Sequence, residues 1–147
     1  MYITNTGKPI LAMMLDVDHF KKFNDNFGHR YGDEVLKKIS QALLKIYGIG
    51  HCYRYGGDEF LVLRDFTDTD TVAEKDRQFR KELEHARVLD LYRDINVSAG
   101  YTYGIANNSD EIKSMIRLAD HNLYQVKKNC RKDICGSPFQ PNFFEYE

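Results

Sequence analysis

The sequence predicts an α+β fold in which one mainly antiparallel sheet is covered by helices. An almost uninterrupted apolar run over residues 9–17 is typical of a strand that is buried on both faces. Two runs of strand-like composition flank the pair Gly56–Gly57, which is a hairpin signal. Stretches with apolar residues at helical spacing stand between and after these strands, so helices are expected to pack against the sheet.

The first half of the chain is expected to hold the first strand and two helices. Asp18 follows the apolar run and is a plausible N-terminal cap, so a short helix is expected from there to Gly28. A longer helix is expected from Asp33 to Tyr47. Its apolar positions follow the helical period closely: Val35, Leu36, Ile39, Ala42, Leu43 and Ile46.

The second half is expected to continue with the hairpin, a helix, a strand and a last helix. The hairpin link is interpreted as the two residues Gly56–Gly57. Residues 69–89 are predicted to be helical, with a stripe of Val72, Phe79, Leu83 and Ala86. Residues 95–105 have the β-rich composition of a strand, and the helical stripe returns from Asp110 to Asn129.

Composition limits the class of protein. The chain has 147 residues, 42% of them hydrophobic, which suits one globular domain. Its 21 basic and 22 acidic residues give a net charge of −1, which argues against a nucleic-acid polymer as ligand but allows a local basic cluster for a small phosphate compound. No segment approaches the ~20 apolar residues of a membrane span, and no signal peptide is recognised. Three scattered cysteines favour reduced thiols in a cytoplasmic protein, with metal or disulfide use as the alternative.

Several acidic residues stand where strands are expected to end. Asp16 closes the most apolar strand, and Asp18 is expected to point to the same side because side chains alternate along a strand. If the hairpin lies beside this strand, Asp58 comes close to Asp16. Converging carboxylates repel each other but become favourable around a hard divalent cation such as Mg²⁺ or Mn²⁺. The alternative is that these acids beside a turn are simply solvated.

Four segments of the chain resemble one known family. They are "RYGGDEF" at residues 54–60, "LDVDHFKKFNDNFGHRYGDEVL" at 15–36, "INVSAGYTYG" at 95–104 and "LADHNLYQVKKNCR" at 118–131. Together they resemble the GGDEF-domain family, the diguanylate cyclases, from about Leu11 to about Arg131. The resemblance implies a nucleotide-cyclase or polymerase-palm-like fold, which is a ferredoxin-like α+β domain with a central antiparallel sheet.

The resemblance also implies an activity. Diguanylate cyclases join two GTP molecules into cyclic di-GMP, a bacterial second messenger, and release two pyrophosphates. Each subunit holds one GTP, and a head-to-head homodimer lets each 3′-hydroxyl attack the α-phosphate of the other nucleotide. The chain is therefore expected to be a GTP-binding signalling transferase of the cytoplasm that acts as a homodimer.

The family's metal site falls on the acids already noted. The resemblance assigns Mg²⁺ or Mn²⁺ to Asp16, the backbone carbonyl of Val17, and Asp58, with Glu59 as a supporting or alternative ligand. Asp58 and Glu59 are accordingly the expected catalytic residues. Glycines without a Cβ at Gly56–Gly57 would let the turn lie close to the substrate while the following acid reaches the metal.

Guanine recognition is assigned by the resemblance to Asn24 and Asp33. A carboxylate can accept from both N1–H and the exocyclic amine of guanine, whereas adenine presents a bare N1 acceptor, so Asp33 would favour GTP over ATP. The alternative for Asp33 is an ordinary helix N-cap before Val35.

The triphosphate is assigned to two basic regions. Backbone N–H groups at the start of a helix form an anion site, and the family match places the amides of His19 and Phe20 there, together with Lys21. Lys127 and Arg131 match further phosphate contacts at the end of the last helix. Their alternative role is to complement the dipole at that helix C-terminus.

The expected domain organisation is a GGDEF domain over residues 1–135 and an aromatic tail over 136–147. Family members usually begin with a helix and an Asp-x-Leu-Thr-x-Leu-x-Asn-Arg segment, which is not found before the first strand, and no sensory domain is recognised. A catalytically weak or inactive module that binds GTP or a partner domain is therefore the alternative function. A structural domain with coincidental acids is a third.

Overall fold

The apolar run near the start of the chain forms β1 (Ile10–Val17), the strand around which the sheet is built. All eight of its residues are buried. In the computed structural model, which describes residues 7–129, the sheet order is β2–β3–β1–β6 and every neighbouring pair is antiparallel. The other strands are β2 (Cys52–Arg54), β3 (Glu59–Asp65) and β6 (Val97–Gly104). The predicted α+β class is confirmed.

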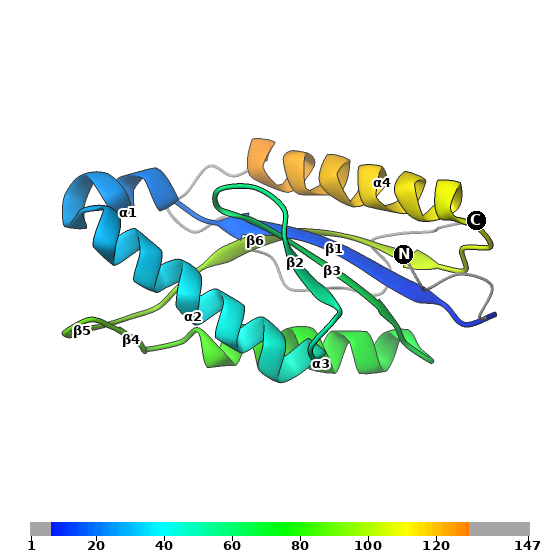
Figure 1. Ribbon diagram of the computed structural model, residues 1–147, viewed down its shortest axis with the longest axis horizontal. Coiled ribbons are helices and arrows are strands. Elements are labelled where there is room, and N and C mark those ends of the chain that lie inside the picture. Colours follow the sequence, from blue (N-terminus) through cyan, green and yellow to red (C-terminus); the bar gives the residue numbers. More distant parts are fainter. Residues whose placement is uncertain (1–6, 130–147) are drawn as a thin grey trace.

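Helices cover both faces of this sheet. Figure 1 shows α4 (Ser109–Lys128) along one face and α2 (His29–Tyr47) with α3 (Thr69–Glu82) along the other, while α1 (Phe20–Phe27) lies beyond the end of β1. Alternate residues of β1 point to opposite faces, so the strand joins two hydrophobic cores. Leu15 belongs to the core that β1 forms with α2 and α3, whereas Met14, on the opposite face, belongs to the core formed with α4.

Two helix starts differ from the sequence prediction. Asp18 does not cap α1, because the cap position is His19, whose backbone is left-handed at φ 59°, and no side chain caps this end. Asp33 is not a cap either, because α2 already begins at His29. Gly32, just before it, lies within α2, and its missing Cβ leaves room for the Asn24 side chain of α1. The contact between α1 and α2 therefore explains why a glycine stands here.

The predicted helix over residues 69–89 is too long. Helix α3 ends at Glu82, and a second small sheet follows, made of β4 (Ala86–Val88) and β5 (Leu91–Arg93). Ala86 therefore belongs to a strand, not to the helical stripe. The turn between these strands places Leu89 at φ 55°, a conformation that sequence rules associate with glycine or asparagine, so no local signal marks it.

The glycine hairpin is confirmed, but its link is longer than two residues. Residues 55–58 connect β2 to β3, and the amides of Tyr55 and Gly56 both donate to the carbonyl of Glu59. The Arg54 guanidinium donates to the carbonyls of Gly56 and Gly57, at 3.3 and 2.5 Å. The turn is thus stabilised by its own backbone and by the arginine that precedes it.

Helix α4 starts with a well-formed cap. The Asn108 side chain accepts from the Glu111 amide at 2.9 Å, and the Glu111 carboxylate accepts from the Asn107 amide at 3.0 Å.

We expect Asn108→Ala to lower the free energy of unfolding by about 1 kcal/mol in urea denaturation. Asn107→Ala keeps its backbone donor and is the matched control, with an expected change below about 0.5 kcal/mol. Equal losses in the two variants would contradict the capping role.

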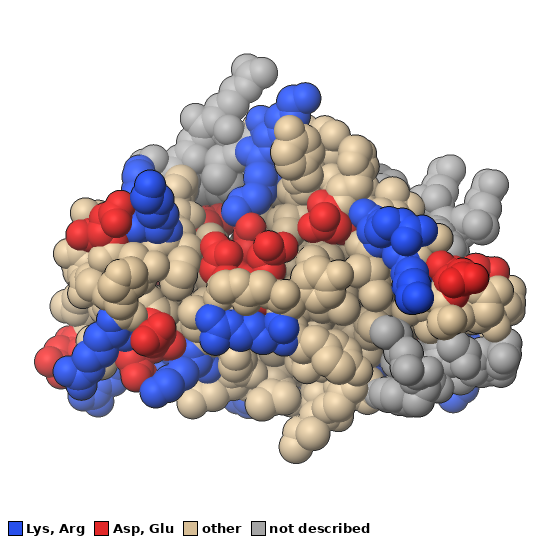
Figure 2. Space-filling view, turned by 45° about the horizontal axis from the view of Figure 1, so that its top comes forward, with Lys and Arg blue, Asp and Glu red and all other residues tan. Residues whose placement is uncertain are grey.

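The surface carries mixed charge. Figure 2 shows one face on which acidic and basic side chains are interspersed, with a group of acids near its centre. Within the described part of the chain, no helix has both the length and the apolar composition needed to span a bilayer. Arg131 and the predicted aromatic tail lie outside the described residues.

Candidate functional site

The C-terminal end of β1 and the glycine hairpin lie together at the edge of the sheet where β1 ends, although β1 itself is a central strand. Asp16 is paired with Glu59 of β3 on one side and with Ser98 of β6 on the other. Directly opposite residues of an antiparallel pair share a face, so these three side chains leave the sheet on the side of α4. Asp58 lies close enough that its charge raises the pKa of Asp16. The first strand and the hairpin therefore lie side by side, as expected.

Asp16 is a buried carboxylate with one cationic partner. Lys127, in the last turn of α4, donates from Nζ to Asp16 Oδ2 at 2.6 Å. The pKa of Asp16 is raised to about 6, chiefly by burial and also by the charges of Asp58 and Asp18, against the lowering effect of Lys127. The other oxygen, Oδ1, is buried and has no hydrogen-bond partner among the described residues.

Asp18 is held at the start of β6 instead of capping α1. Its Oδ1 accepts from Ser98 Oγ at 2.5 Å, and its backbone N–H donates to the carbonyl of Asn96 at 2.9 Å. The side chain is buried, and within residues 7–129 its Oδ2 has no partner. Ser98 was not predicted, because nothing in the sequence pairs it with a residue eighty positions earlier.

A divalent cation fits the chemistry of this edge. The unpartnered oxygens Asp16 Oδ1 and Asp18 Oδ2 are buried carboxylate donors, which suit Mg²⁺ or Mn²⁺. The side chain of Val17 packs in the core, so only its backbone could serve as a ligand. Within residues 7–129 the structure does not gather three or more acidic, histidine or cysteine side chains into a metal-binding group, and Asp58 and Glu59 are half-buried.

The start of α1 has no side-chain cap. Backbone amides at a helix start without such a cap suit an anion. Phe20 opens the helix directly after His19, and Lys21 is exposed beside it. The three residues predicted to contact phosphates therefore lie together, within a short distance in sequence of Asp16.

The two residues predicted to contact guanine lie near each other but line different surfaces. Asn24 packs against Gly32, the residue before Asp33. Asp33 is exposed in a cavity of about 660 Å³ that it shares with Arg54 of the hairpin, whereas Asn24 is not among the lining residues. Arg54 was missed as a site residue, although it opens the quoted stretch RYGGDEF.

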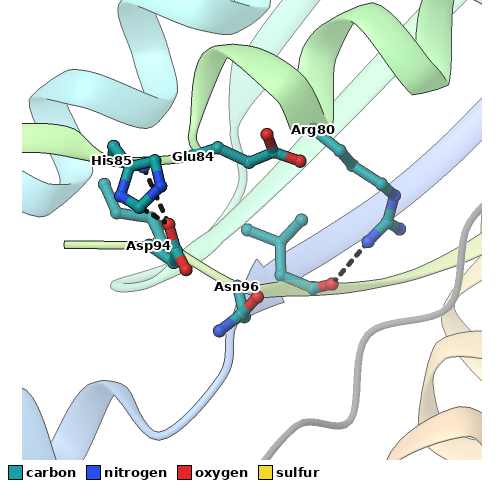
Figure 3. Close-up of a pocket in the computed structure, with 7 residues that line it drawn as sticks. Arg80, Glu84, His85, Asp94 and Asn96 are labelled. Carbon is teal, nitrogen blue, oxygen red and sulfur yellow. Dashed lines mark hydrogen bonds and ion pairs between the residues drawn. The ribbon is translucent and has the colours of Figure 1, made fainter.

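A separate cavity of about 330 Å³ lies between the end of α3 and the start of β6 (Figure 3). None of the predicted site residues lines it. Arg80 points across it and donates to the Val97 carbonyl at 3.0 Å, and the same guanidinium contacts Asp76 and Tyr101. This satisfied buried network fixes α3 to β6, next to the segment that holds Asp18.

Comparisons with known proteins point to one family. The family model described as "Diguanylate cyclase, GGDEF domain" matches residues 2–133. The diguanylate cyclase DosC of Escherichia coli K12 is 32% identical over 136 residues, which are 90% of this chain and 29% of DosC. The response regulator PleD of Caulobacter vibrioides is 34% identical over 139 residues, which are 88% of this chain and 30% of PleD. The chain thus spans about three tenths of these relatives.

Solved structures agree in fold. The active GGEEF domain of a diguanylate cyclase from Vibrio cholerae has a TM-score of 0.71 and 30% identity, over 84% of this chain and 80% of that domain. The GGDEF domain of DgcB from Caulobacter crescentus, solved in complex with c-di-GMP, also has a TM-score of 0.71 and 30% identity, over 85% of this chain and 75% of that one.

Proposed function

Because the chain belongs to the GGDEF family of diguanylate cyclase domains, we propose that it condenses two GTP molecules into cyclic di-GMP. Each 3′-oxygen forms a new bond to the α-phosphorus of the other GTP, the α–β phosphoanhydride bond breaks, and pyrophosphate leaves. The ring of the cyclic dinucleotide closes when both transfers have occurred. Since each subunit holds one GTP, the two nucleotides must meet across a dimer.

One observation carries this proposal. The strand register sets Asp16 opposite Glu59, beside Asp58, at a sheet edge where two buried carboxylate oxygens have no partner among residues 7–129. A buried carboxylate oxygen without a partner is costly, so a cation is the natural complement of this edge. The uncapped start of α1 and the hairpin beside Asp16 are features that suit a nucleoside triphosphate.

Asp16, the Val17 carbonyl and Asp58 would hold the divalent cation, with Glu59 in support. When bound, the cation lowers the pKa of the attacking hydroxyl and neutralises charge on the phosphates. The protein's own contribution is positioning. Residues of the α1 start, with Lys21, Lys127 and Arg131, hold the triphosphate, so that the α-phosphorus faces the partner's hydroxyl.

The assay for this function uses the full chain, GTP and Mg²⁺, with the cyclic dinucleotide detected by chromatography. Activity per molecule should rise with protein concentration, because two subunits must meet. Absence of product at every concentration, with GTP binding retained, would instead favour a module that binds nucleotide without turnover.

Selectivity for guanine provides a sharper test. Asp33→Ser removes the carboxylate that would accept from N1–H and the amine of guanine, so the preference for GTP over ATP should fall by about tenfold or more. A competition binding assay measures this preference. Glu34→Ser is the matched control, since it removes a carboxylate from the same cavity, together with its surface pair with Lys37 at 3.2 Å, but leaves Asp33 in place. An unchanged preference in Asp33→Ser would remove Asp33 from the guanine site.

A further inference from the structure

Lys127 lies where a cation is needed. Its Nζ contacts Asp16 Oδ2 at 2.6 Å from a side chain that is 39% exposed, whereas the Asp16 side chain is only 12% exposed. The lysine therefore reaches inward from the surface to a carboxylate that cannot move out to water. The pair joins residues 111 positions apart in the sequence.

The same lysine is also the proposed phosphate contact. Its single positive charge would be shared if it contacted both Asp16 and a triphosphate, so neither anion would be fully neutralised. If it left Asp16 alone, a buried carboxylate would remain near Asp18 and Asp58 without a counter-charge. Departure of the lysine and arrival of another cation are therefore linked.

We infer that Lys127 is a resident counter-ion of Asp16 that competes with the divalent cation and moves to the triphosphate when nucleotide binds. This inference rests on the proposed function and adds to it a coupling between the binding of the metal and the binding of nucleotide. Metal alone binds weakly, because it must displace the lysine. Nucleotide offers the lysine a second anion, so nucleotide and metal strengthen each other's binding, and the coupling is reciprocal.

The test is Mn²⁺ binding to the full chain without nucleotide, measured by electron paramagnetic resonance of free Mn²⁺. Lys127→Met removes the competitor and should tighten Mn²⁺ binding about tenfold, a usual size for such coupling. Lys128→Met removes the same charge from the next, exposed residue of α4 and should change the affinity less than twofold. Circular dichroism checks that both variants are folded.

A third variant separates this inference from the proposed function. Asp16→Asn should abolish Mn²⁺ binding. If Asp16→Asn loses the metal but Lys127→Met binds it no more tightly than the wild type, the counter-ion role is wrong and the cation site stands. If Asp16→Asn binds Mn²⁺ as the wild type does, the cation site itself is wrong. Equal gains in Mn²⁺ affinity in Lys127→Met and Lys128→Met would mean that the effect comes from general surface charge, and would overturn the inference.

Discussion

Asp58→Asn is expected to lower the rate of cyclic di-GMP formation roughly 10³-fold, or about 4 kcal/mol of transition-state stabilisation. Asparagine keeps the size and one oxygen of the side chain but loses the charge that a divalent cation requires. The residue is half-buried in the turn beside Glu59, and its charge acts on Asp16. The fold should be unaffected, because the turn is stabilised by backbone bonds and by Arg54.

The control for this variant is Asp65→Asn, the same change at the far end of β3, the strand that follows Asp58. Asp65 is paired with Ile10, far along β1 from Asp16. Its substitution by asparagine should therefore leave turnover unchanged. Product is quantified by chromatography with GTP and Mg²⁺ at equal protein concentrations. Turnover by Asp58→Asn comparable to that of Asp65→Asn would exclude the assigned role in metal binding.

Gly100→Ala is expected to destabilise the fold by about 3 kcal/mol, a large part of the stability of an ordinary domain. Gly100 lies in β6 on the face covered by α4. A Cβ there would overlap the backbone carbonyl oxygen of Ala119 and the backbone nitrogen of Leu123, and would come within 2.8 Å of the Leu123 Cα. Backbone atoms of a helix cannot move aside as a flexible side chain can, so the whole helix would have to shift.

Thermal denaturation measures this effect, with an expected fall in Tm of about 10 °C. Gly57→Ala is the matched control, because its added Cβ meets nothing within 4 Å and its backbone is not left-handed. A Gly100→Ala variant as stable as Gly57→Ala would mean that α4 does not lie directly on β6 at this point. Since α4 carries Lys127, the same variant should also weaken the ion pair with Asp16.

Much of the fold could be predicted because its signals are local. The apolar run of β1, the stripe of α4 and the glycine turn each depend on residues adjacent in sequence, and all three elements are present, although the turn is two residues longer than predicted. The failures have the opposite origin. Gly32 lies within α2 and leaves room for the Asn24 side chain of α1, and the β4–β5 turn places a leucine at positive φ, so neither feature has a signature within its own segment.

The candidate site divides in the same way. From residue types and their resemblance to a family, the sequence by itself determined which carboxylates, lysines and glycines are candidates for the chemistry, since those predictions depend on what each side chain can bind. Only the tertiary structure decided their pairing: Lys127 with Asp16, Ser98 with Asp18, and Arg54 beside Asp33. Such contacts join strands and helices distant in sequence, and burial makes each partner's charge depend on the other, which no local pattern records.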